Sequence, residues 1–94
     1  MRVLMRLVAK PENVTALRAV VLAVAGSARK EPGCRGYQVL QNSADPCEFT
    51  LVEDYVDQAA LDAHLAAPYV QKAFAEGVPM LAKEPDMRRY EIVG

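Results

Sequence analysis

Residues 31–55, EPGCRGYQVLQNSADPCEFTLVEDY, are the part of the sequence that indicates the fold most clearly. They open with Glu-Pro-Gly, a turn in which proline fixes φ at one central position and glycine permits a positive φ at the next. Residues 34–41 and 48–55 then have the length and composition of strands, and the polar loop 42–46 separates them. The pattern predicts two antiparallel strands joined as a hairpin.

The sequence before the hairpin predicts a strand followed by a helix. Residues 2–9 alternate imperfectly and have the length and β-branched content of a strand. Pro11 suits the first turn of a helix. Apolar residues then recur at spacings of three and four, as on one side of a helix of about four turns. They are Val14, Leu17, Val21, Val24 and Ala28.

The sequence after the hairpin predicts a second helix and a fourth strand. Asp57 can cap this helix, Pro68 interrupts it, and residues 70–76 form a further short turn or two. Residues 87–93 again have strand character. The order βαββαβ predicts one α+β domain over residues 1–94. Its topology is ferredoxin-like, with a four-stranded antiparallel sheet and two helices on one face.

Apolar residues on both faces of the predicted strands indicate that the second face is also covered. Leu4 and Val8 oppose Met5 and Leu7 in the alternation. A sheet covered on one side only would show polar residues on the other. The simplest cover is the sheet of an identical subunit, so we expect a homodimer.

Composition argues against two classes of partner. Lys and Arg total 11 against 12 Asp and Glu, a net charge of −1, so the chain lacks the basic field that nucleic acid requires. The longest apolar run, residues 19–25, is far shorter than the roughly 20 residues that span a bilayer. Arg6 and the following Lys10-Pro11-Glu12 do not fit a signal peptide, so we expect a cytoplasmic protein without membrane partners.

The cysteines and the motif inventory predict neither a disulfide nor a metal site. Cys34 and Cys47 begin successive antiparallel strands and so lie at opposite ends of the hairpin, too far apart to be bridged. Two cysteines with one histidine make a poor zinc set. No glycine-rich phosphate loop, CxxC pair or HExxH motif is present.

His64, the only histidine, is the first candidate for catalysis. Leu61 and Leu65 share its side of the helix, so it should point inward. An imidazole titrates near neutrality and is the usual general base. The alternative is a buried histidine whose polar atoms are satisfied by a carbonyl or a carboxylate and which has only a structural role.

Glu53 is the second candidate, because glutamate is rarely buried without a partner and this one shares a strand face with apolar residues. It can orient His64 by accepting the imidazole N–H. The alternative is an ion pair with an arginine on a neighbouring strand, namely Arg6, Arg35 or Arg89.

Four aromatic side chains are candidates for binding a flat aromatic ligand by stacking, namely Tyr37, Tyr55, Tyr69 and Phe74. The alternative for each is ordinary core packing, which suits Phe74 best because it has no hydroxyl to satisfy. Cys34 reads as a small buried hydrophobe, since no base lies beside it in the sequence.

A series of landmarks runs through the sequence in order. They are Glu31-Pro32-Gly33-Cys34, Tyr37, residues 49–53 (FTLVE), Leu61-Asp62-Ala63-His64 and Phe74. Together they resemble the antibiotic biosynthesis monooxygenase domain over nearly the whole chain. The resemblance implies a dimeric α+β barrel with a pocket between the sheet and the helices of each subunit. It also implies oxidation of a phenol or quinol by O₂ without metal, flavin or haem.

The chain departs from this family pattern at two positions. Many members carry Trp two residues after the glutamate that matches Glu53, where this chain has Tyr55. Many carry a second His near Pro68, where this chain has Tyr69. The haem-degrading branch uses an Asn in the first strand and a His in the last short helix. This chain has neither, so the resemblance disfavours that branch.

Three functional hypotheses follow. In the first, His64 deprotonates a phenolic or quinol-type aromatic, Glu53 holds the imidazole, and the electron-rich anion reduces O₂ directly. In the second, the replacements at Tyr55 and Tyr69 leave a non-catalytic dimer that only binds a small molecule. In the third, the protein is an isomerase or lyase in which His64 shuttles protons.

Overall fold

One antiparallel sheet of four strands organises the chain, and the computed structural model describes all of residues 1–94. The strands are β1 (Arg2–Val8), β2 (Cys34–Gln41), β3 (Glu48–Tyr55) and β4 (Asp86–Tyr90). Their order across the sheet is β2-β3-β1-β4, and every neighbouring pair is antiparallel. The predicted α+β fold with ferredoxin-like topology is confirmed.

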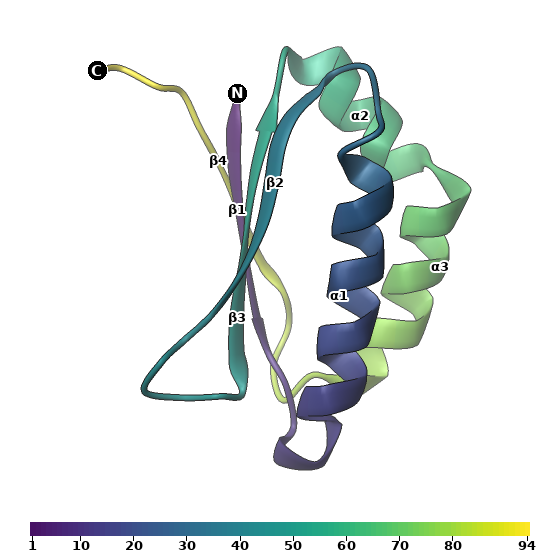
Figure 1. Ribbon diagram of the computed structural model, residues 1–94, viewed down its shortest axis with the longest axis vertical. Helices are drawn as coiled ribbons and strands as arrows, with labels where there is room; N and C mark the ends of the chain where they lie inside the picture. Colours follow the sequence, from purple (N-terminus) through teal and green to yellow (C-terminus); the bar gives the residue numbers. More distant parts are fainter.

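Three α-helices cover one face of this sheet and leave the other bare (Figure 1). They are α1 (Val14–Ala28), α2 (Gln58–Ala66) and α3 (Pro68–Gly77). Two short 3₁₀ turns, Pro11–Asn13 and Val78–Met80, flank α1 and α3. None of the helices combines the length and the apolar character that crossing a bilayer requires.

Local chemistry explains where the helices begin. The Asp57 carboxylate accepts a hydrogen bond from the Ala60 amide at 2.9 Å, so the predicted cap of α2 is confirmed. Pro11 begins a 3₁₀ turn and α1 starts only at Val14, which corrects the expected start. Pro68 opens the first turn of α3, where a missing N–H costs nothing. The segment expected to be a short turn is therefore a ten-residue helix.

The fourth strand ends earlier than expected, at Tyr90 instead of residue 93. β4 lies at the edge of the sheet and pairs only with β1, where Arg2 is already the partner of Tyr90. Arg2 is also the first residue of β1. Residues 91–94 therefore have no ladder to join, and they are exposed.

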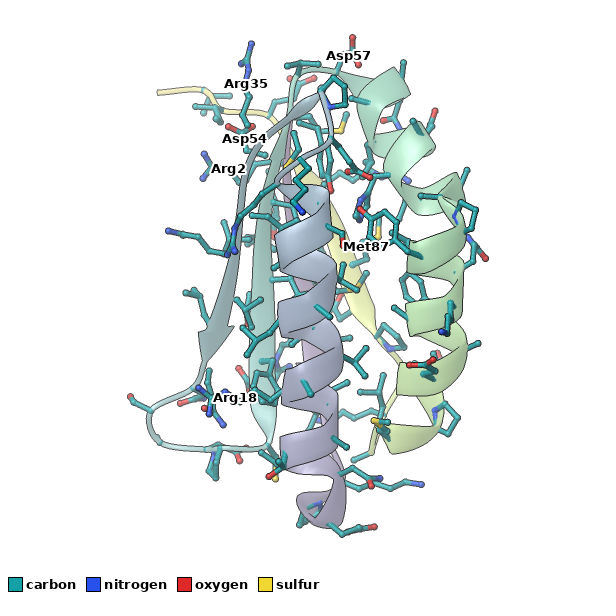
Figure 2. The ribbon with its side chains drawn as sticks, turned by 45° about the vertical axis from the view of Figure 1, so that its right-hand side comes forward. Arg2, Arg18, Arg35, Asp54, Asp57 and Met87 are labelled. Atoms are coloured by element: carbon teal, nitrogen blue, oxygen red, sulfur yellow. The ribbon has the colours of Figure 1, made fainter.

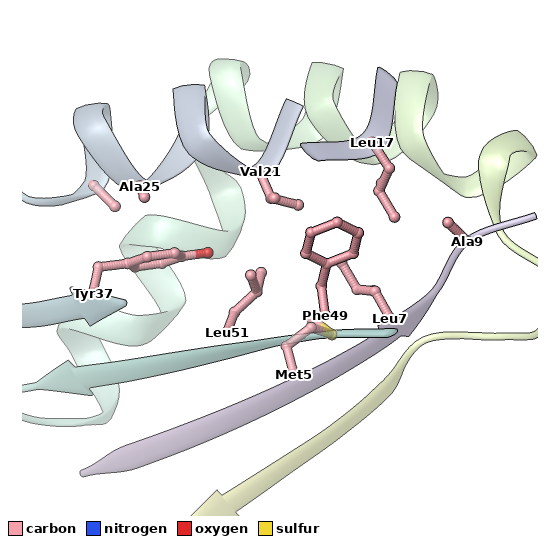
Figure 3. Packing of buried hydrophobic residues seen from close by; sticks show 10 residues of the cluster. Met5, Leu7, Ala9, Leu17, Val21, Ala25, Tyr37, Phe49 and Leu51 are labelled. Atoms are coloured by element: carbon pink, nitrogen blue, oxygen red, sulfur yellow. The ribbon is translucent and has the colours of Figure 1, made fainter. Parts of the chain in front are cut away.

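The helix-covered face holds the core, and the strands follow the predicted alternation. The β1 residues Val3, Met5 and Leu7 are buried on this face. Figure 3 shows the Phe49 ring pointing from β3 toward Leu17 of α1, where it is 1% exposed. Met5, Leu7, Leu17 and Phe49 belong to a larger buried cluster that joins α1 to β1, β2 and β3, whereas Val3 packs with Tyr55 and Leu61 in a smaller one.

Strand register aligns a row of side chains that reaches the functional site. Glu53 on β3 is paired with Tyr37 on β2 and with Val3 on β1. All three side chains lie on the helix-covered face and are at most 3% exposed. A carboxylate and a phenol thus stand side by side within the core layer.

The bare face mixes apolar and charged side chains. Charged pairs cross it between β1 and β3, with Arg6 Nη2 at 2.8 Å from Glu48 Oε2 and Arg2 Nη2 at 3.9 Å from Asp54 Oδ2. Figure 2 shows Arg2, Arg35 and Asp54 on the side of the sheet away from α2 and α3.

Both cysteines of the hairpin are free, as predicted.

Candidate functional site

A cavity of about 60 Å³ lies between the sheet and the helices. Apolar side chains from all three helices and from β1 and β3 form most of its wall. The polar groups in the wall come from Tyr37, Glu53 and His64. One end of an otherwise apolar cavity therefore carries the groups that can exchange protons.

Helix α2 places His64 in the wall of this cavity. Leu61 and His64 lie three residues apart and share the inward side of the helix, where they are 0% and 3% exposed. The predicted inward orientation of His64 is confirmed. The Asp57 cap at the start of α2 helps to hold the helix that carries it.

A carboxylate lies near each nitrogen of the His64 ring. Nδ1 is 2.9 Å from Glu31 Oε1, which is a hydrogen-bond distance. Nε2 is 3.8 Å from Glu53 Oε1, which is too long for a hydrogen bond. The hydrogen-bond partner of His64 is therefore Glu31 and not Glu53, which corrects the expectation from the sequence.

Close docking of the Glu-Pro-Gly turn against α2 brings Glu31 to His64. A Cβ placed on Gly33 would overlap the Cβ of Ala60, so only glycine permits this approach. The amide of Val56 also donates to the Gly33 carbonyl at 2.9 Å. No glycine in the chain has a positive φ, so Gly33 serves packing here, and the left-handed conformation expected of it is absent.

Two tyrosines support the two carboxylates. The Tyr55 hydroxyl donates to Glu53 Oε1 at 3.1 Å, and the Tyr69 hydroxyl donates to Glu31 Oε2 at 2.8 Å. Burial, the largest effect in each case, raises the pKa of both hydroxyls, so both stay protonated donors.

The predicted aromatic residues divide into two groups. Tyr37 and Phe74 line the cavity, where they can contact a ligand. Tyr55 and Tyr69 surround the His64 ring, with centroid distances of 5.3 and 6.2 Å, but they are not part of the cavity wall. They reach the site through Glu53 and Glu31, and their role as direct ligand contacts stays a prediction.

Glu53 titrates near neutrality. Burial raises the pKa of its carboxyl to about 7; the charge of Glu31 adds to the rise, and the Tyr55 hydrogen bond opposes it. No arginine forms an ion pair with Glu53, and Arg6 pairs with Glu48 instead. The structure therefore contradicts the alternative in which Glu53 forms an ion pair with an arginine.

Sequence reasoning missed Glu31 as a site residue. The Glu-Pro-Gly triplet was visible as a turn and as a landmark, yet 33 positions separate Glu31 from His64. A carboxylate beside a turn that contains an obligatory glycine was the one available signal. Cys34, expected to be a small buried hydrophobe, packs against the core but is only partly buried, and this burial raises the pKa of its thiol.

Comparison with known sequences identifies relatives. Residues 1–76 match the family model described as antibiotic biosynthesis monooxygenase. Rv0793 of Mycobacterium tuberculosis, which carries a provisional monooxygenase name, is 40% identical over 67 residues, or 71% of this chain and 65% of that protein. The protein sll1783 of Synechocystis sp., whose name assigns no function, is 28% identical over 83 residues, or 88% of this chain and 56% of that protein. In these sequence alignments the chain spans less than two thirds of the length of either relative.

Comparison with solved structures agrees with the sequence match. The structure of Rv0793 superposes with a TM-score of 0.88 at 26% identity, covering 99% of this chain and 97% of that one. A crystal structure of an antibiotic biosynthesis monooxygenase superposes with a TM-score of 0.94, covering 99% and 98%. At 22% identity the latter shows the shared fold alone. With its first 76 residues matching the family model, this chain belongs to the antibiotic biosynthesis monooxygenase family.

Proposed function

We propose that this protein is a monooxygenase that oxidises a phenolic or quinol-type aromatic with O₂ and uses no metal, flavin or haem. The observation that carries the proposal is the polar end of the cavity, where His64 Nε2 and Glu53 Oε1 lie 3.8 Å apart in a wall whose one other polar group is Tyr37. A ligand hydroxyl can enter between the two groups, and an aromatic ring can rest against the apolar remainder.

The reaction balances with substrate and O₂ alone. His64 takes the phenolic proton, and the phenolate passes one electron to O₂. The resulting radical pair joins at a ring carbon, and His64 returns its proton to give a hydroperoxide. Loss of the hydrogen on that carbon and cleavage of the O–O bond form a quinone carbonyl and hydroxide. The released proton converts hydroxide into water, so phenol and O₂ become quinone and water.

Glu53 suits the second proton transfer. With a pKa of about 7, its carboxyl can accept the ring proton and pass it to the departing hydroxide without a large energetic penalty in either direction. The Tyr55 hydroxyl keeps this carboxyl in place. The apolar wall excludes water, which otherwise would protonate the reactive anion.

Substrate entry requires the cavity to widen. At about 60 Å³ it has room for a few water molecules, whereas an apolar cavity of roughly 150 Å³ accommodates benzene. Ladder hydrogen bonds join the strands of the sheet side, whereas α1 and α3 contribute Leu17, Val21 and Phe74 and pack on the sheet through side chains. We therefore expect binding to displace the helix side of the cavity and not the sheet.

The bare face of the sheet supports a homodimer as part of the proposal. It carries apolar side chains on three strands, including Leu4, Val52 and Leu40, and Leu40 is 48% exposed. Two copies that pack these faces together would cover them and form a barrel of two sheets. The mass in solution, measured by light scattering, tests this: a monomer at micromolar concentration contradicts it.

The decisive experiment is O₂ uptake by chelator-treated protein against a panel of quinols and phenolic polyketides. His64→Ala should lower turnover by about 100-fold or more, the usual contribution of a general base. Thr15→Ala, at an exposed position of α1, serves as the matched control and should leave turnover unchanged.

Each other outcome identifies an alternative. Undiminished turnover in His64→Ala would rule out the mechanism. Product formation without O₂ consumption would indicate an isomerase or lyase that uses the same histidine. Ligands that raise the melting temperature and are never converted would indicate a binding protein.

A further inference from the structure

We propose that Glu31 and Tyr69 form a positioning pair behind His64, which keeps the proton of the neutral imidazole on Nδ1 and leaves the Nε2 lone pair facing the cavity. The catalytic consequence rests on the proposed function, whereas the proton position itself does not. Nothing in the sequence pattern alone pairs these two residues with His64.

The hydrogen bonds determine which nitrogen carries the proton. Glu31 receives the Tyr69 hydroxyl on Oε2 at 2.8 Å, and His64 Nδ1 lies 2.9 Å from its other oxygen. An ionised carboxylate can only accept hydrogen bonds, so Nδ1 must be the donor. A neutral imidazole has one N–H, and its other nitrogen, Nε2, then carries the lone pair.

The opposite side of the His64 ring, which carries Nε2, faces the cavity. Nε2 has no hydrogen-bond partner, and its nearest carboxylate is Glu53 at 3.8 Å. His64 and Glu53 both line the cavity, whereas Glu31 and Tyr69 do not. The two carboxylates therefore have different positions, one behind the base and one beside the substrate.

The break between α2 and α3 makes this arrangement possible. Tyr69 follows His64 by five residues, and in a continuous helix it would point roughly 140° away from it. Ala67 has extended backbone and Pro68 starts a new helix, so the chain turns between the two. The Tyr69 hydroxyl consequently lies 3.5 Å from His64 Nδ1 as well as beside Glu31.

Nitrogen NMR of protein labelled with ¹⁵N-histidine tests the proposal directly. Because His64 is the only histidine, the spectrum contains a single pair of ring nitrogens and needs no assignment by mutation. Spectra recorded from about pH 5 to about pH 10 span the range in which an imidazole ordinarily loses its proton. We expect Nδ1 to carry the proton in the neutral form. A neutral form with the proton on Nε2 would overturn the proposal, whatever the variants do.

Variants then link the proton position to turnover. Glu31→Ala should shift the neutral imidazole toward the Nε2–H form and lower kcat by about 10-fold to 100-fold, as when the partner of a ligating histidine is removed. Glu31→Gln retains an acceptor oxygen, so it should keep the Nδ1 proton and recover part of kcat. Tyr69→Phe should have a smaller effect, because Glu31 stays in place.

Glu12→Ala is the matched control, since this exposed glutamate has no ion pair, and it should change neither readout. A Glu31→Ala variant that folds and keeps both the wild-type proton position and the wild-type kcat would contradict the proposal. If Glu31→Ala fails to fold, the wild-type spectrum and Tyr69→Phe still decide. If Nδ1 carries the proton but the protein takes up no O₂, this inference stands and only the proposed function is refuted.

Discussion

The apolar region around Phe49 and the polar region around His64 share one layer between sheet and helices, yet they contribute to the protein in opposite ways. Phe49 is 1% exposed and packs among aliphatic side chains of β1 and α1 (Figure 3). Burying such a ring removes apolar area from water and stabilises the fold. This region has no polar group that needs a partner.

In the polar region, His64 and Glu53 are each only 3% exposed. Burying a carboxylate without full hydrogen bonding is unfavourable, and Glu53 receives a single side-chain hydrogen bond, from Tyr55. Its raised pKa is the consequence. The comparison shows that one end of the layer stabilises the fold while the other holds groups that are reactive because they are incompletely satisfied.

Phe49→Ala should have the largest effect on stability. We expect a loss of about 3–5 kcal/mol in the free energy of unfolding, because the neighbouring side chains cannot collapse far enough to fill the space that the ring leaves. Urea unfolding at neutral pH measures it, and Phe49→Leu should lose less. The exposed Leu22, changed to alanine, should stay within about 0.5 kcal/mol of wild type. Equal losses at the two positions would contradict the assignment of stability to this region.

Glu53→Gln should change how stability depends on pH. Below pH 4.5 the carboxyl is protonated in both states, whereas between about 4.5 and about 7 only the native state retains the proton. The free energy of unfolding of the wild type should therefore fall as pH rises through this window, by about 3 kcal/mol. Glutamine has no proton to lose, so the variant should lack the step.

Urea unfolding at about pH 4.5 and about pH 8 measures the difference. The variant should equal the wild type at the lower pH and exceed it at the higher pH, while turnover falls. Glu12→Gln, an exposed control, should reproduce the wild-type slope. Identical slopes in Glu53→Gln and wild type would show that Glu53 is not the group that titrates.

Gly33→Ala should disturb the polar region alone, because Gly33 lies where the Glu-Pro-Gly turn docks on α2. The new methyl group would overlap Ala60, so α2 must move at a cost of about 1–3 kcal/mol, and His64 must separate from Glu31. Gly26 lies within α1 with open space around it, and its change to alanine should stabilise by up to about 1 kcal/mol. Thermal unfolding of both variants measures the opposite signs. A neutral Gly33→Ala would contradict the close docking.

Much of the fold was predictable because it depends on local patterns. The alternation that buries Val3 and Met5, the spacing that makes α1, and the Asp57 cap are all properties of a few adjacent residues. They set the order of the elements, and the order limits the topology to the one observed. The same local reasoning placed His64 on the inward side of α2.

The end of β4 and the partner of His64 depended on residues far apart in the chain. β4 stops at Tyr90 because that residue pairs with Arg2, the first residue of β1, nearly 90 positions earlier. Glu53 was expected at the imidazole because its strand face points inward, and it does reach the cavity, but 3.8 Å from Nε2.

Most of the elements, their order, their buried faces and the residue types available for proton transfer could be predicted from local patterns, since these follow from periodicity and local hydrogen bonding. The three-dimensional packing was needed to show that Glu31 and not Glu53 is hydrogen-bonded to His64, and that Tyr69 stands behind it. The reason is that this contact depends on how closely a turn docks on a helix. That distance is set by the missing side chain of Gly33 against Ala60 and by the break before Pro68, and no periodicity in the sequence records it.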